Sequence, residues 1–128
     1  MDFSVRACFV GELEDAETFA VVLRDHLNEP QEWLEIQRPL FADQQDKQLG
    51  MDTYCLTRSS GATHYGGVSV CILERNILTL HLNDDAAAAL VTSQVLLRLD
   101  LADVAFAELQ KGLITIFAQR LPDSFSIA

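Results

Sequence analysis

The 128-residue chain has few positive charges, few cysteines and no long apolar segment. Nine Lys and Arg stand against nineteen Asp and Glu, which gives a net charge of −10. Nucleic acids and anionic membranes both require a basic face, so this shortage argues against either as a partner. No apolar run reaches the length of a membrane span, and residues 1–15 lack the basic region and apolar core of a signal peptide. We therefore expect a cytoplasmic protein.

The cysteines are too few and too widely spaced for a disulfide framework. Cys8, Cys55 and Cys71 are odd in number, form no CxxC pair and fall inside expected strands. They are typical of small buried hydrophobic residues in a reducing compartment.

No group of residues has the spacing of a catalytic or metal site. Cys55 with His64 and Asp52 is the nearest approach to a nucleophile, a base and an orienting group. Cys55 lies in an expected strand, where nothing lowers the pKa of its thiol. His64, His81 and Cys71 match no metal-binding pattern and offer no fourth ligand. We expect no enzyme activity, no metal and no cofactor.

The apolar pattern predicts a single α+β domain over residues 1–128. Apolar residues make up 49% of the chain, which is enough for a core at this length. We expect a mostly antiparallel sheet of about six strands, with one long C-terminal helix and one short Ala-rich helix. The clearest strand runs are 3–9, 33–38, 53–57, 65–74, 77–82 and 94–101. Residues 19–27 fit a strand or a helix, and the β-branched pair Val21-Val22 favours a strand.

The middle of the chain predicts a three-stranded antiparallel meander over 53–57, 65–74 and 77–82. Residues 58–61 supply a polar turn, and Arg75-Asn76 a tight hairpin turn. Gly66-Gly67 weakens a strand, so this pair indicates a bulge or a close backbone approach.

Two helices follow from capping residues and periodicity. Asn83 is a good N-cap for a helix over 84–90, whose first turn is acidic. Asp103 is expected to cap a last helix, which runs from Val104 to about Arg120 with one apolar stripe. Gly112 in mid-helix costs about 1 kcal/mol relative to Ala, so we expect a close contact there.

The negative charge is concentrated in residues 1–52, which carry a net charge of about −8. Such a field favours a basic protein partner. Residues 39–50 form the most plausible long loop. Aromatic side chains inside an acidic rim have the anatomy of a protein-binding patch, although Trp33 could equally belong to the core. The expected partner-binding residues are Glu29, Glu32, Trp33, Glu35, Phe41, Asp43 and Asp46.

The order of several short motifs resembles a known family. Tyr54-Cys55-Leu56, Tyr65-Gly66-Gly67 and the leucine strand 78–82 precede the small-residue helix 84–90, as in the Immunity protein 10 family of bacterial polymorphic toxin systems. The similarity covers about a third of the chain, and none of its motifs is a catalytic or metal-binding motif.

The resemblance implies a non-enzymatic protein that binds and neutralises a cognate toxin encoded beside it. An acidic inhibitor would suit a toxin that is a basic nuclease. The alternative is a self-associating structural module, in which the free edge of a sheet pairs two copies as a homodimer.

Overall fold

The computed structural model describes residues 1–13, 17–39, 53–117 and 125–127, which form ten strands and two helices. The strands are β1 (Asp2–Val5), β2 (Ala7–Leu13), β3 (Thr18–Arg24), β4 (Trp33–Pro39), β5 (Cys55–Arg58), β6 (Thr63–Tyr65), β7 (Val68–Glu74), β8 (Ile77–Leu82), β9 (Gln94–Leu99) and β10 (Phe125–Ile127). The helices are α2 (Asp84–Leu90) and α3 (Asp103–Phe117).

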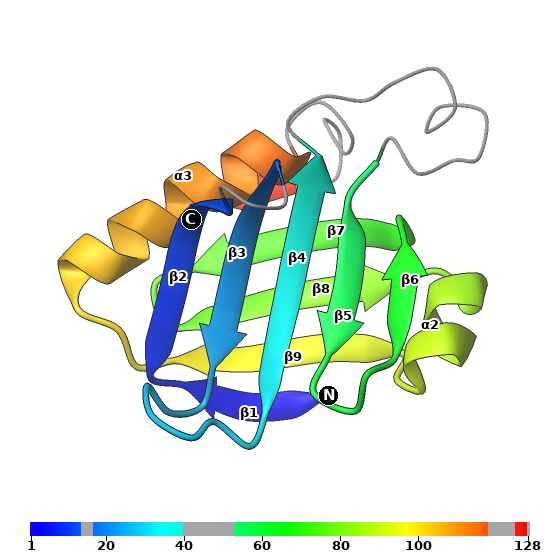
Figure 1. Ribbon diagram of the computed structural model, residues 1–128, viewed down its shortest axis with the longest axis horizontal. Coiled ribbons are helices and arrows are strands. Elements are labelled where there is room, and N and C mark those ends of the chain that lie inside the picture. Colours follow the sequence, from blue (N-terminus) through cyan, green and yellow to red (C-terminus); the bar gives the residue numbers. More distant parts are fainter. Residues whose placement is uncertain (14–16, 40–52, 118–124, 128) are drawn as a thin grey trace.

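The strands form two five-stranded sheets that cross one another face to face (Figure 1). Sheet A has the order β1-β9-β8-β7-β10, and sheet B has the order β2-β3-β4-β5-β6. Sheet B is antiparallel throughout, whereas sheet A contains two parallel pairs, β1 with β9 and β10 with β7. The expected α+β class and mostly antiparallel pairing are confirmed. The expectation of a single sheet of about six strands is wrong.

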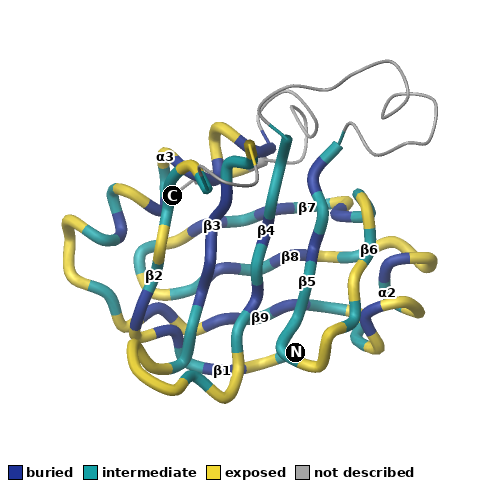
Figure 2. The backbone as a smooth tube through the Cα atoms, in the orientation of Figure 1, coloured by how far each residue is buried: buried dark blue, intermediate teal, exposed yellow. Residues whose placement is uncertain are grey.

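The core lies between the two sheets, because each sheet turns its apolar side chains toward the other. Leu23, Ile36 and Leu56 of sheet B are fully buried, as are Leu78 and Leu97 of sheet A. Figure 2 shows this alternation as dark stretches along the crossing strands. Burying five such side chains stabilises the fold by about 2 kcal/mol each before chain entropy is counted.

Helix α3 covers part of the inner face of sheet B and completes the core. A Cβ atom on Gly112 would lie 2.7 Å from Val10 Cγ1 and 2.8 Å from Val21 Cγ2, so the helix approaches β2 and β3 as closely as it can. The close contact predicted for Gly112 is therefore confirmed. At the end of the helix, the Phe117 ring meets the Tyr54 ring edge-on with centroids 4.9 Å apart.

The start of α3 differs slightly from the expectation. Asp103 is the first residue of the helix and not the cap before it, since the Phe106 N–H already donates to the Ala102 carbonyl. Arg75 holds this end in place. Its guanidinium donates to Asp103 Oδ1 at 2.9 Å and to the Leu101 carbonyl at 2.7 Å, and lies 4.8 Å from the Phe106 ring centroid.

The expected strand over 3–9 is two strands in two sheets. The chain bends at Arg6, so that β1 pairs with β9 of sheet A and β2 pairs with β3 of sheet B. Phe3 and Val5 stay in the core, but Phe9 moves to the opposite side of sheet B and is 39% exposed. The alternation of apolar residues correctly predicted a strand on each side of Arg6, but it did not indicate the bend between them.

The expected meander is also wrong, because Gly66-Gly67 is a crossing point between the sheets. β5 and β6 form a hairpin in sheet B, and β7 and β8 form a hairpin in sheet A. Gly67 has φ +94°, and a Cβ atom there would lie 2.4 Å from the Ala86 Cβ of α2. The predicted close approach is confirmed, while its larger consequence, a change of sheet, was missed.

Other local predictions hold. Most of the run 19–27 is strand, since β3 ends at Arg24. The turn at Arg75-Asn76 joins β7 to β8, and Asn83 caps α2 by accepting from the Ala86 N–H at 2.9 Å. The other end of α2 is held by Arg58, whose Nη1 donates to the Leu90 carbonyl at 2.6 Å. The expected loop over 39–50 lies outside the described residues except for Pro39, which ends β4.

Candidate partner-binding site

Sheet B has an outer face that turns away from the core, and its residues follow from the strand register. Each strand alternates, so the partners of Val22 in both neighbouring strands, Phe9 and Glu35, share its face. We call this the outer face of sheet B. It is made of Ala7, Phe9, Gly11, Leu13, Thr18, Ala20, Val22, Arg24, Trp33, Glu35, Gln37, Cys55, Thr57, Thr63 and Tyr65.

The outer face is hollowed over β2, β3 and β4. The hollow has a volume of about 550 Å³ and more apolar than polar lining. We call it the aromatic hollow. Its lining residues are Phe9, Leu13, Val22, Arg24, Pro30, Trp33 and Glu35. An aromatic, open hollow of this size can receive a large side chain from a partner.

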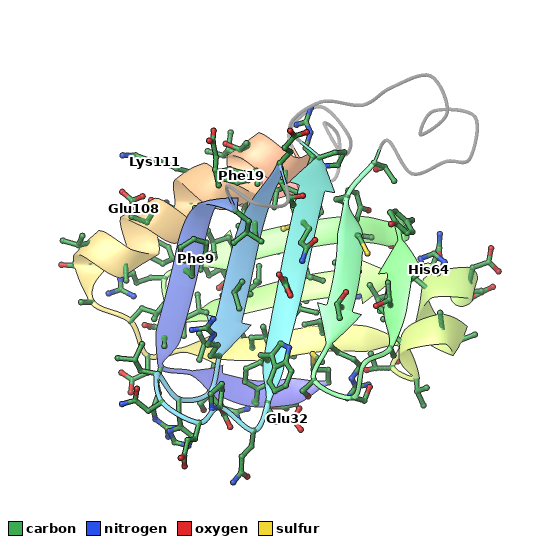
Figure 3. The ribbon with its side chains drawn as sticks, viewed as in Figure 1. Phe9, Phe19, Glu32, His64, Glu108 and Lys111 are labelled. Carbon is green, nitrogen blue, oxygen red and sulfur yellow. The ribbon has the colours of Figure 1, made fainter. Side chains whose placement is uncertain are left out.

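The side chains at the centre of the outer face of sheet B are less exposed to solvent than those of an ordinary solvent-facing sheet. Ala20 is fully buried and Val22 is 7% exposed, although both point away from the core. Larger neighbours cover them. The Phe9 ring leans along β2 over Gly11, where an added Cβ would lie 3.4 Å from the ring. Figure 3 shows Phe9 on the β2 side of the sheet.

Two charged side chains of opposite sign belong to the lining. Glu35 accepts a hydrogen bond from Gln37 Nε2, its neighbour on the same face. Arg24 lies beside Trp33 across the β3–β4 ladder. Because these charges are opposite, the hollow itself is not strongly acidic.

The acidic side chains gather instead at the end of the hollow, in the β3–β4 connection. Glu29 and Glu32 are exposed there, and Glu29 has a positive φ of 51°. The connection is held by the Gln31 N–H, which donates to Asp25 Oδ1 at 3.1 Å, and by Ser59 Oγ, which donates to Glu32 Oε2 at 3.3 Å. Figure 3 places Glu32 beside the start of β4.

The structure brings part of the expected site together. Trp33 and Glu35 line the hollow, and Glu32 directly precedes Trp33. Trp33 is half-buried on the face opposite Leu34 and Ile36, so it is not a core residue. Glu29 is exposed one residue before Pro30 of the lining. Phe41, Asp43 and Asp46 lie outside the described residues.

Sequence reasoning missed Phe9, Leu13 and Val22. Phe9 was placed in the expected strand over 3–9 and was not included in the expected site. One signal was present. Residues 19–23 are apolar without alternation, which is typical of a strand covered on both faces.

Of the three cysteines expected to be buried, Cys71 is buried, whereas Cys8 and Cys55 are half-buried. Burial raises the pKa of Cys8 to about 11 and that of Cys71 to about 12. The pKa of Cys55 is also raised, mainly by burial and further by the nearby Glu35 carboxylate, against an opposing hydrogen bond with Thr57. A raised pKa makes each thiol a poor nucleophile at neutral pH.

The groups weighed as catalytic or metal-binding are not assembled. Cys55 lies on the outer face of sheet B, whereas His64 pairs with the inward-facing Leu56 and its Nδ1 lies 3.2 Å from the Gly66 carbonyl oxygen. Asp52 lies outside the described residues. His81 is exposed on sheet A, while Cys71 points into the core. No set of three metal-ligating side chains occurs in the part of the chain that the structure describes.

The sequence was compared with known proteins. Residues 4–107 match the family described as Immunity protein 10, and this range contains all of sheet B, most of sheet A and the first turn of α3. The chain belongs to the Immunity protein 10 family. Membership indicates an immunity protein, whose partner is a toxin, and such proteins are generally not enzymes. Neither the curated proteins nor the solved structures gave a match to this chain. Among the described helices, none has the length and apolar character needed to cross a membrane.

Proposed function

We propose that this protein neutralises a cognate bacterial toxin by binding it with the outer face of sheet B, without carrying out a reaction itself. The observation that carries the proposal is the aromatic hollow, because family membership supplies the kind of partner and the hollow supplies a place to bind it. Residues 1–128 act as one domain, in the bacterial cytoplasm where the toxin would otherwise act.

The division of roles follows from the chemistry of this face. Trp33 and Phe9 bound an open hollow and can enclose an apolar side chain of the toxin, which is the usual anatomy of a binding hot spot. Glu29 and Glu32 lie outside that centre, where charges mainly accelerate encounter and set its salt dependence. The net charge of −10 suits a basic target such as a nuclease.

The test is a binding titration against the purified product of the neighbouring toxin gene, at low and at high salt. We expect a one-to-one complex whose association rate falls as salt rises, together with loss of toxin activity. A folded protein that fails to bind this product at any salt concentration overturns the proposal.

The second candidate function is self-association, which draws on β2 being an edge strand of sheet B. Sedimentation over a wide concentration range distinguishes the two. A strictly monomeric protein at high concentration removes self-association.

A further inference from the structure

The backbone direction of β2 can be read from the ladder next to it. The Asp25 N–H donates to the Glu32 carbonyl at 3.0 Å, one position beyond the last pair of the β3–β4 ladder. Residues of an antiparallel strand alternate between its two neighbours. Odd-numbered residues of β3 therefore bond to β4, and even-numbered residues bond to β2.

The even-numbered residues of β3 pair with the odd-numbered residues of β2. This leaves Cys8, Val10 and Glu12 with their N–H and C=O groups directed away from the sheet. Among the described residues, these backbone groups have no hydrogen-bond partner. Helix α3 covers the inner face of β2 through Gly112 and Val10, and no described strand pairs with the edge itself.

Apart from the charge of Glu12, the edge lacks the devices that usually block strand pairing. Natural proteins protect long edges with Pro, Lys, bulges or short strands. β2 is seven residues long, contains neither Pro nor Lys, and pairs with β3 without a register shift. The other edges are shorter: β1 has four residues, and β6 and β10 have three each.

We infer that an extended segment of the toxin pairs with the edge of β2 and so adds a sixth strand to sheet B. This inference rests on the proposed function. The same strand carries Phe9 and Leu13 of the aromatic hollow, so one partner can pair with the edge and fill the hollow together.

Charge selects the toxin over a second copy as the occupant. Two copies would each bring a net charge of −10, and this repulsion opposes pairing. The one charged residue of β2 is Glu12, so a basic segment meets no positive charge along this strand.

Two substitutions at Glu12 isolate the backbone from the side chain. Glu12→Ala and Glu12→Pro both remove the exposed carboxylate, but only Glu12→Pro removes the outward N–H. We expect Glu12→Pro to bind the purified product of the neighbouring toxin gene at least tenfold more weakly than Glu12→Ala, with equal thermal stability. Equal affinities for two folded variants overturn the inference.

Amide hydrogen exchange of the natural sequence tests strand pairing at β2 even if the proline variant does not fold. In the toxin complex we expect exchange at Cys8, Val10 and Glu12 to slow at least tenfold, while the odd-numbered amides of β2 change little. Tight binding with unchanged exchange at these three residues rejects strand pairing and leaves the proposed function standing. Protection that appears with rising concentration of this protein alone identifies a second copy as the occupant and rejects the inference. Absence of binding rejects both proposals.

Discussion

The outer faces of the two sheets both arise from the alternation of side chains along a strand. They differ in the kinds of side chain that they expose. On sheet A, Arg98 contacts Asp2 and lies 3.2 Å from Ser4 Oγ, so these charges of that face are matched within it. On sheet B, the outer face presents Phe9 and Trp33 around the aromatic hollow and an exposed Tyr65 on β6. An internally paired face needs no partner, whereas an open aromatic face gains free energy when one covers it.

The largest expected effect comes from removing the aromatic wall of the hollow. Trp33→Ala should weaken toxin binding by about 2 kcal/mol or more, roughly 30-fold, because a buried tryptophan is the typical anchor of an interface. Leu96→Ala is the matched change on the outer face of sheet A and should leave affinity unaltered. Calorimetric titration of both variants checks this, and equal losses would remove the distinction between the faces.

A smaller effect separates the inner and outer faces of sheet B. Gly112→Ala should lower the free energy of unfolding by about 1–2 kcal/mol, since the new methyl group would meet Val10 and Val21 within 2.8 Å. Gly11→Ala faces outward, where only the Phe9 ring lies near, and should be neutral or slightly stabilising. Urea denaturation measures both. Stabilisation by Gly112→Ala would contradict the tight packing of α3.

Charge reversal tests where the toxin approaches. Glu29→Lys with Glu32→Lys should slow association about tenfold at low salt and less at high salt, because these carboxylates border the hollow. Glu74→Lys with Asp100→Lys changes the net charge equally at exposed positions outside sheet B and should have a much smaller effect. Stopped-flow mixing gives the rates. Equal slowing would mean that only the total charge matters.

The inner faces of the two sheets should behave alike, in contrast to the outer ones. Cys8 lies in sheet B and Cys71 in sheet A, and burial raises both pKa values above 9. Between pH 9 and about 11 the unfolded chain loses these thiol protons while the folded protein keeps them. The contribution of these thiols to the free energy of unfolding is therefore fully present below pH 9. It falls as pH rises, by about 1 kcal/mol per thiol from pH 9 to 10.

Urea denaturation at pH 8, 9 and 10 follows this loss. Cys8→Ala and Cys71→Ala should each remove part of the slope. If neither variant changes the dependence of the free energy of unfolding on pH, groups other than these two thiols cause the loss of stability at alkaline pH.

Sequence patterns predicted the local structure well, because it depends on neighbours within a few residues. The cap at Asn83, the turn at Arg75-Asn76 and the contact at Gly112 each follow from the chemistry of one or two side chains. What could not be predicted was the sheet that each strand joins. A bend at Arg6 and a crossing at Gly66-Gly67 decide this, and alternation reads the same on either side of them.

The same limit explains the candidate site. Trp33, Glu35 and Glu32 were predicted because they are close together in the sequence. Phe9 and Val22 reach the site through pairing between strands, so their membership depends on the register of sheet B. A residue that reaches the site only through strand pairing is missed when neighbours in the sequence are considered alone, as happened with Phe9.

The parallel pairing of β1 with β9 sets the order in which the protein can be completed during synthesis. Phe3 lies opposite Leu97 in the ladder. β1 can therefore pair only after about ninety further residues have been synthesised, which takes about 5–20 s on the ribosome. All five strands of sheet B are synthesised by Tyr65, well before β9 emerges. The β1–β9 pairing joins parts of the chain that are far apart in the sequence, and such contacts slow folding. The strands of the proposed binding face are therefore synthesised before the strand that secures the N-terminus.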